Sequence, residues 1–222
     1  MPILYYHPLS SFCHKALIAL YVLDVAFERR VIDLGNPADR QALGALWAPT
    51  KFPVLYDEQR QLALPESSII IEYLDRHFAG QHRLIPLDPD TALEMRLWDR
   101  FFDLHMQLPQ QQIVLDRIMG SKGDMGPQRA ALSLAYTMLE ERMAERTWAA
   151  GEQFSMADCA AAPALFYAHT LAPIADGTNT MAYFNRLMKH PSVQRVIREA
   201  QPYFGMYPFK EAIAPRFLGP DV

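Results

Sequence analysis

The chain has 222 residues, of which 50% are hydrophobic and 21% charged, and its formal net charge is −4. This length allows one large or two small domains with substantial cores, and the acidic balance argues against a nucleic-acid surface, which normally needs a clustered basic face. No apolar run approaches the roughly 18 residues that span a bilayer, and the N-terminus lacks the pattern of a secretory signal. We therefore expect a cytoplasmic protein that binds neither membranes nor nucleic acids.

The cysteines and histidines of the chain are too few, and spaced wrongly, for a set of disulfides or a structural metal site. Cys13 and Cys159 are the only two cysteines, and the seven histidines show no spacing typical of zinc sites. The sequence therefore predicts reduced thiols and no bound metal.

The first 80 residues alternate between strand-like and helix-like patterns. The expected elements are a strand at 3–6, a helix at 12–23, a strand at 27–33, a hairpin around the turn at 57–60 and a helix at 67–78. This order, β-α-β followed by β-β-α, is thioredoxin-like in outline, with a right-handed β-α-β unit.

The stretch GQHRLIPLDPDT concentrates glycine and proline between two helix-like patterns and predicts a linker at 81–91. Beyond it the sequence shows only helical periodicity, followed by a proline-rich tail that we expect to pack across the surface. The expected helices are 91–119, 128–147, 156–171 and 181–200. The predicted fold class is α+β, with a thioredoxin-like α/β domain at 1–80 and an all-helical domain at 92–222.

Five segments, in their order and spacing, resemble cytosolic glutathione S-transferases of bacterial type with a serine-type or cysteine-type N-terminal site. They are YYHPLSSFCHKALIAL, APTKFPVL, LPESSIIIEYL, LIPLDP and FSMADCAAAPAL, and together they cover nearly the whole chain. The resemblance implies glutathione as co-substrate, a small hydrophobic electrophile as second substrate, and a homodimer formed through the first domain and the long helices.

In LPESSIIIEYL, a serine begins an apolar helix directly after a glutamate. Ser67 can offer its hydroxyl and backbone N–H to a carboxylate at the positive helix end, while Glu66 can pair with an ammonium group. These two groups match the γ-glutamyl end of glutathione. Without the resemblance, a helix N-cap and an acid favoured by the helix dipole would be the simpler interpretation.

The segment around Pro53 has a second implied role. In proteins that this chain resembles, the equivalent proline is cis, so the resemblance assigns to Phe52 a backbone that pairs with the cysteinyl part of glutathione like an added strand. Lys51 lies where relatives place a side chain near the glycyl carboxylate, although lysine is also a common surface residue.

Ser10 falls on the position at which glutaredoxin-like and omega-type relatives place a nucleophilic cysteine, and Cys13 falls on the second position of that motif. Exchange between two protein thiols is therefore excluded. We expect Cys13 to be a small buried thiol, Cys159 to lie in the core, and His14 to lie on the helix surface.

The Ser10 hydroxyl can donate to a thiolate held at the N-terminus of the first helix. Such a hydrogen bond contributes roughly 1.5–3 kcal/mol and the helix end roughly 0.3–1 kcal/mol, which would lower a thiol pKa from about 8.5 to about 6–7. Two alternatives for this catalytic role stay open. Ser11 resembles the second serine of a zeta-type motif, and Tyr6 lies where tyrosine-type relatives carry their phenol.

The second substrate is expected against Leu9, Phe102, His105 and Met106, all of which could equally be ordinary core, while Trp98 and Phe101 should pack at the domain interface. Three functions are compatible with this pattern: a glutathione transferase, which we prefer, a glutathione-dependent reductase or isomerase, and a transferase-like binding module without catalysis.

Overall fold

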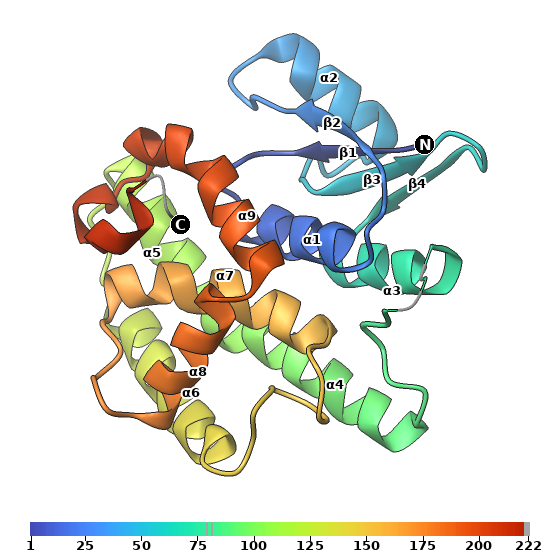
Figure 1. The fold of residues 1–222 in the computed structure, drawn as a ribbon. Coiled ribbons are helices and arrows are strands. Elements are labelled where there is room, and N and C mark those ends of the chain that lie inside the picture. Colours follow the sequence, from blue (N-terminus) through green and yellow to red (C-terminus); the bar gives the residue numbers. More distant parts are fainter. Residues whose placement is uncertain (79, 81, 220–222) are drawn as a thin grey trace. The chain divides into compact units, whose positions relative to one another are not determined.

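The computed structural model describes residues 1–78, 80 and 82–219, and it divides into two compact units, residues 1–85 and 86–222 (Figure 1). The predicted linker begins at Gln81, which lies outside the described residues. The elements of the first unit are β1 (Pro2–Tyr6), α1 (Ser11–Val22), β2 (Glu28–Val31), α2 (Pro37–Leu46), β3 (Val54–Asp57), β4 (Leu62–Pro65) and α3 (Ser67–His77).

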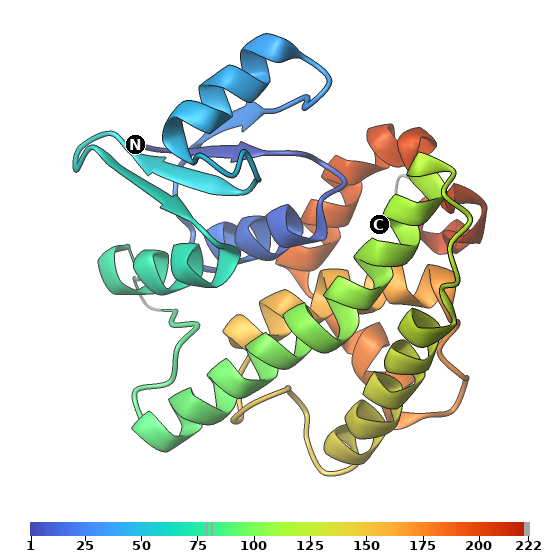
Figure 2. The same ribbon diagram turned by 180° about the vertical axis from the view of Figure 1, so that it is seen from behind.

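The four strands form one mixed sheet in the order β2-β1-β3-β4. Strand β1 runs parallel to β2 and antiparallel to β3, and β3 pairs with β4 as a hairpin. Helices α1 and α3 cover one face of the sheet and α2 covers the other (Figure 1, Figure 2). The prediction of a thioredoxin-like first domain is confirmed.

Helix α1 is buried on nearly every side, and the predicted surface position of His14 on this helix is wrong. His14 is almost fully buried, not on the helix surface, and its Nε2 lies 2.6 Å from the carbonyl oxygen of Pro8. A helix that is enclosed all round has no solvent face for a polar residue, so the ring must find a partner inside the protein.

Helix α2 was not predicted from the sequence. Its start carries a clear signal, because the side chain of Asn36 accepts the Ala38 N–H at 2.9 Å and Pro37 occupies the first helical turn. Leu43 is the buried residue of this mostly polar helix, and it packs with Ile32 and Val54. One buried position gives too little periodicity to reveal a helix.

The first unit includes the chain segment that follows α3. The carboxylate of Asp75, in α3, accepts the backbone N–H of Leu84 at 2.6 Å and that of Ile85 at 3.4 Å, and Arg83 lies 3.4 Å from its other oxygen. Asp75 and Leu84 are both buried. These contacts fix residues 83–85 against α3.

A buried carboxylate at the end of β3 should make stability depend on acid pH. Asp57 accepts hydrogen bonds from the Tyr73 hydroxyl at 2.5 Å and from Arg60 at 2.8 Å. The Tyr73 bond, aided by Arg60 and by backbone N–H groups and opposed by burial, lowers the pKa of Asp57 to about 2. Because the folded pKa lies below the unfolded value of about 3.9, this stabilisation is present above pH ~4 and is lost as the pH falls through 2.

We therefore expect Asp57→Asn to lower the free energy of unfolding by about 1–2 kcal/mol at pH 7, with the deficit shrinking towards pH 2. Urea unfolding of both proteins between pH 2 and 7 measures it. Tyr73→Phe should be strongly non-additive with Asp57→Asn, and a deficit that is constant with pH would refute the account.

The second unit contains helices and no strand within residues 86–219, which confirms the prediction of an all-helical second domain (Figure 2). Its helices are α4 (Pro89–Phe101), the π-helical segment η1 (Phe102–Gln107), α5 (Leu108–Met119), α6 (Gly126–Met143), α7 (Met156–Leu171), α8 (Asn179–Met188) and α9 (Pro191–Ala200). No helix of the described residues is long and apolar enough to cross a membrane.

Prolines account for two departures from the predicted helices. The stretch 91–119 is helical throughout but changes to π geometry just before Pro109, whose ring would clash with the carbonyl of an α-helical His105. The stretch 181–200 is two helices, because Pro191 begins α9 and the His190 side chain caps it by accepting the Ser192 N–H.

The proline-rich tail forms only short 3-10 turns, η2 (Gln201–Met206), η3 (Lys210–Ala212) and η4 (Pro215–Phe217). Phe204, Tyr207 and Phe217 are buried, and Phe217 packs edge-on against Phe166 of α7. A tail that packs without forming an α-helix is therefore confirmed up to residue 219, and Pro220 lies outside the described residues.

Candidate functional site

Three chain segments meet at one edge of the sheet. In the strand register, Val54 lies opposite Tyr5 of β1 and opposite Pro65 of β4. The end of β1, the start of β3 and the end of β4 therefore share an edge. Tyr6 comes directly after Tyr5, Glu66 directly after Pro65, and Pro53 directly before Val54. The candidates from three separate motifs are therefore neighbours in the fold.

Two side-chain contacts join the loops at this edge. The ring of His7, just after β1, stacks on Phe52 with centroids 5.7 Å apart and planes 18° from parallel. The Nζ of Lys15, in α1, donates to the Oγ of Ser68, in the first turn of α3, at 2.8 Å. The N-termini of α1 and α3 and the segment before β3 are thus held together.

Ser10 is the N-cap of α1, in an extended conformation. Its Oγ accepts the backbone N–H of Cys13 at 3.3 Å, and the residue is half-buried. Because this bond uses a lone pair of the oxygen, the hydroxyl proton can still be donated to another acceptor. The two alternatives, Ser11 at the start of α1 and Tyr6 at the end of β1, are both buried.

The thiol of Cys13 is unreactive, as the sequence predicts. Cys13 has no exposed surface, and burial raises the pKa of its thiol to about 12, against the smaller opposing effects of Ser10 and the His7 backbone. Both cysteines are buried, and neither forms a disulfide within the described part of the chain. A thiol with this pKa is neither a nucleophile nor a thiol-exchange partner near neutral pH.

Glu66 and Ser67 lie where α3 begins. Glu66 is the N-cap, but its side chain makes no capping bond, and no hydrogen bond or ion pair engages its exposed carboxylate within the described part of the chain. Its φ of 68° is rare for a residue with a side chain and is typical of functional sites. Ser67 is the buried first residue of the helix rather than its cap, so the simpler interpretation of this pair as an N-cap serine does not apply.

The segment before β3 has the geometry that the resemblance implies. The Phe52–Pro53 peptide bond is cis. Phe52 is half-buried and precedes the first paired residue of β3, whereas Lys51 is exposed.

Sequence reasoning assigned no role to two residues of this edge. The backbone N–H of His7 donates to the Cys13 sulfur at 3.4 Å, and the ring Nδ1 of His7 accepts the Leu9 N–H at 3.2 Å. Burial lowers the pKa of His7, against a smaller opposing effect of Asp33, and so favours the neutral ring. Lys15 is only 1% exposed. Both lie in the segment YYHPLSSFCHKALIAL without an assigned role there, although a lysine inside an otherwise apolar helix was a signal that it has a buried partner.

The candidates for the second substrate belong to both units. Leu9 lies in the first unit and is half-buried, while Phe102, Met106 and exposed His105 lie on η1. The rings of Trp98 and Phe101 pack together with centroids 4.7 Å apart. No group of three or more metal-binding side chains occurs among residues 1–78, 80 and 82–219.

Comparison with known proteins agrees with this architecture. Residues 4–82 match the family model of the glutathione S-transferase N-terminal domain, and residues 103–191 match that of the C-terminal domain. The chain is 29% identical over 110 residues to the glutathione S-transferase-like protein LUC7 of Fusarium, a match that covers 48% of this chain and 50% of that protein.

Two bacterial relatives match over more of their length. A stringent starvation protein A homolog of Coxiella burnetii is 28% identical, covering 73% of this chain and 74% of that protein. Glutathione S-transferase GstB of Escherichia coli is 22% identical, covering 85% and 93%.

A solved glutathione S-transferase of Methylobacillus flagellatus with glutathione bound superimposes with a TM-score of 0.74 at 20% identity, covering 88% of this chain and 98% of that one. Family models that match both halves of the chain, in the same order as its two structural units, show that it belongs to the glutathione S-transferase family.

Proposed function

We propose that the protein is a glutathione transferase, which ionises the thiol of bound glutathione and directs the thiolate at an electrophilic carbon of an apolar second substrate. The observation that carries this proposal is the shared sheet edge, where the N-termini of α1 and α3 meet the segment before β3. Glutathione is an extended tripeptide with charges at both ends, and this edge offers a complementary group for each part.

The exposed carboxylate of Glu66 pairs with the γ-glutamyl ammonium group, and the Ser67 hydroxyl and N–H receive the adjacent carboxylate at the positive end of α3. The backbone of Phe52 pairs with the cysteinyl residue, and Lys51 approaches the glycyl carboxylate. Lys15 acts through Ser68 as a positioning residue, because its bond holds the first turn of α3 against α1.

The sulfur of glutathione then lies at the N-terminus of α1, where Ser10 donates its hydroxyl proton to the thiolate. The thiolate supplies the electron pair for the new sulfur–carbon bond. On an aryl halide, the halide leaves with its own bonding pair; on an enone, the electrons pass to the oxygen and water returns a proton to carbon. No protein nucleophile takes part.

The test is conjugation of glutathione to 1-chloro-2,4-dinitrobenzene and to an enone, with Cys13→Ala as the discriminating variant. Because the Cys13 thiol is buried and its pKa is raised, we expect this variant to keep its kcat/KM within about twofold while losing about 1 kcal/mol of stability. Loss of activity in a folded Cys13→Ala protein would instead favour the reductase mechanism, and no turnover across an electrophile panel would contradict the transferase.

A binding module without catalysis is the second candidate, because the relatives include a stringent starvation protein A homolog, which is not named as a transferase. It predicts that glutathione binds without any depression of its thiol pKa. The buried reduced cysteines are compatible with either function and with a cytoplasmic location.

We further propose that the protein forms a homodimer through its long helices. Exposed leucines follow one another along α4, η1 and α5 with steps of four and seven residues, which is the spacing of one helical face. This leucine stripe consists of Leu93, Leu97, Leu104, Leu108 and Leu115. Exposed apolar side chains aligned on one surface are a common mark of a protein–protein interface.

Sedimentation equilibrium of Leu97→Glu and Leu104→Glu tests the dimer. We expect the wild type to sediment as a dimer and each variant to dissociate, because burying an unpaired carboxylate in an apolar interface costs several kcal/mol. Met206→Glu, at an equally exposed position of the tail, is the matched control and should remain dimeric. A monomeric wild type would contradict the proposal.

A further inference from the structure

Three residues around the start of α1 are joined in a closed ring of hydrogen bonds. The backbone N–H of Ser10 donates to the carbonyl oxygen of His7 at 3.0 Å, and the Ser10 Oγ accepts the backbone N–H of Cys13 at 3.3 Å. The backbone N–H of His7 in turn donates to the sulfur of Cys13 at 3.4 Å. The hydroxyl that we propose as the thiolate donor therefore belongs to a turn that begins at His7.

The side chain of His7 makes two further contacts. Its Nδ1 accepts the Leu9 N–H at 3.2 Å, across the same turn. Because this nitrogen is an acceptor, the proton of the neutral ring lies on Nε2, and burial, which lowers the pKa of His7, favours this neutral form. The face of the ring stacks on Phe52, with centroids 5.7 Å apart and planes 18° from parallel. One side chain thus contacts both the turn before α1 and the segment before β3.

In the proposed complex, the cysteinyl residue of glutathione meets two protein groups at once. Its sulfur receives the hydroxyl proton of Ser10, while its main chain pairs with the backbone of Phe52. Ser10 precedes α1 and Phe52 precedes β3, so the separation of these two segments must match the dimensions of a single residue. A misplacement of about 1 Å in such a site can lower a rate about a hundredfold. A side chain that contacts both segments is therefore suited to fix their separation.

We propose that His7 is a positioning residue for bound glutathione: its Nδ1 fixes the turn that carries Ser10, and its ring face fixes the segment that carries Phe52. This inference rests on the proposed transferase function and adds a distinct claim, which is that the two contacts of one side chain control different properties of the bound tripeptide. The acceptor nitrogen controls the thiol pKa through Ser10, and the ring face controls the affinity through Phe52.

Two substitutions separate these contacts. His7→Phe keeps a ring that can stack on Phe52 but has no acceptor for the Leu9 N–H. We expect it to raise the thiol pKa of bound glutathione by about 0.5–1 unit, because the Ser10 hydroxyl is no longer held towards the sulfur. His7→Asn keeps an acceptor, since an asparagine side chain can bond the backbone two residues on, but it has no ring. We expect it to leave the thiol pKa within about 0.3 units of the wild-type value.

Each property has its own measurement. Ultraviolet absorbance of the thiolate as a function of pH gives the thiol pKa. Calorimetric titration with a glutathione analogue that carries 2-aminobutyrate in place of cysteine gives the affinity, because this analogue has no thiol whose ionisation could alter its Kd. We expect His7→Asn to raise this Kd about fivefold, as is typical of a lost ring contact, and His7→Phe to leave it within about twofold.

The same contact can be removed from its other side. Phe52→Leu keeps the backbone groups proposed to pair with glutathione but loses the ring that stacks on His7. It should raise the Kd for the analogue about as much as His7→Asn does. The double variant should bind no more weakly than either single variant, because both changes break one contact. If His7→Asn fails to fold, Phe52→Leu tests the contact by itself.

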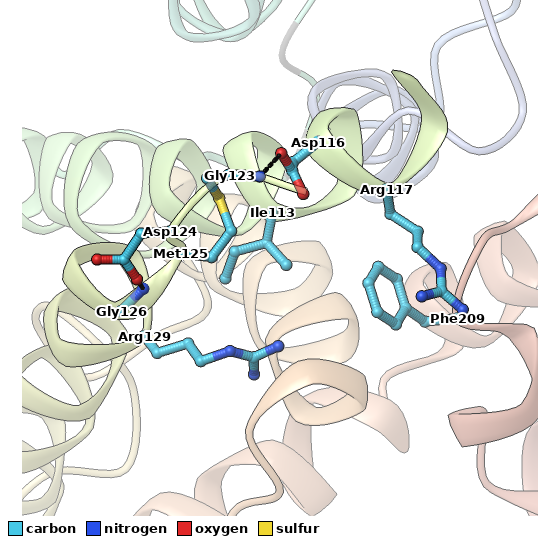
Figure 3. A pocket seen from close by; sticks show the side chains of 9 residues that line it. All are labelled: Ile113, Asp116, Arg117, Gly123, Asp124, Met125, Gly126, Arg129 and Phe209. Carbon is cyan, nitrogen blue, oxygen red and sulfur yellow. Dashed lines mark hydrogen bonds between the residues drawn. The ribbon is translucent and has the colours of Figure 1, made fainter. Parts of the chain in front are cut away.

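Two matched controls break ring contacts that the proposed site does not use. Arg117→Gln removes the contact between Arg117 and the ring of Phe209, which are 5.8 Å apart at a pocket of the second unit (Figure 3). His77→Asn removes a histidine ring that packs on Tyr73 in the first unit, with centroids 4.5 Å apart. Both variants should match the wild type in the Kd for the analogue and in the thiol pKa of bound glutathione.

A substitution that only disturbs the fold would change both properties together. Parallel changes of the Kd and the thiol pKa in both His7 variants, or no change in either, would overturn the role of His7 and leave the transferase proposal standing. A wild type in which the thiol pKa of bound glutathione is not depressed would instead contradict the proposed function, and this inference with it.

Discussion

Replacing Ser10 with alanine is expected to raise the thiol pKa of bound glutathione by about 1–2 units and to lower kcat/KM near pH 6.5 by about tenfold to a hundredfold. The Ser10 oxygen accepts the Cys13 N–H, so its proton remains available for the thiolate. A hydrogen bond to a charged group contributes roughly 1.5–3 kcal/mol, and 1.36 kcal/mol corresponds to one pKa unit. Ultraviolet absorbance of the thiolate as a function of pH measures the shift directly.

The same substitution removes the cap of α1, which should cost about 1 kcal/mol of stability. Ser10→Thr is the matched control, because threonine keeps both the hydroxyl and the capping oxygen. The thiol pKa of glutathione bound to this variant should stay close to the value in the wild type. If Ser10→Ala keeps a depressed pKa, the donor is Ser11 or Tyr6, and the variants Ser11→Ala and Tyr6→Phe identify which one.

Replacing Glu66 with glutamine should raise the Kd for glutathione about tenfold or more, with little effect on kcat at saturation. The exposed Glu66 side chain makes no capping bond to α3, so the change removes a charge and leaves the fold intact. Loss of one charge-assisted pair accounts for this magnitude. Calorimetric titration of both proteins with glutathione measures it.

The ligand itself supplies the sharpest control for this prediction. An analogue of glutathione without the γ-glutamyl amino group should bind wild type and Glu66→Gln equally, because the proposed partner is missing in both cases. Glu58→Gln, an exposed acid in the β3–β4 turn, should bind glutathione like the wild type. Equal loss of affinity for glutathione and the analogue would show that Glu66 does not pair with the ammonium group.

The elements with strong local signals were predictable from the sequence. The strands β1, β3 and β4 and the helices α1, α3 and α7 lie close to their expected bounds, because apolar runs and turn residues mark them in the local sequence. Helix α2 was missed because a single buried leucine, Leu43, carries no period, although Asn36 and Pro37 marked its start. The break at Pro191 was also readable, since proline ends a helix and starts the next.

In the candidate site too, some features were predictable from the local sequence and others were not. The position of Ser10 at a helix start follows from local sequence, whereas the stacking of His7 on Phe52 and the bond from Lys15 to Ser68 join residues far apart in the chain. Such contacts depend on strand register and helix packing, which no short motif encodes. His14 was assigned to the surface for a related reason, because its burial is set by the surroundings of α1 and not by its own neighbours.

The contacts of Asp75 bear on where the first half of the chain can be cut. A fragment that ended at residue 80 would keep the buried Asp75 carboxylate but lose the N–H groups of Leu84 and Ile85, leaving a charge without its backbone donors at a cost of about 1–3 kcal/mol. The first compact unit therefore extends through Ile85. Limited proteolysis should accordingly spare residues 82–85 and leave them attached to the sheet-containing half.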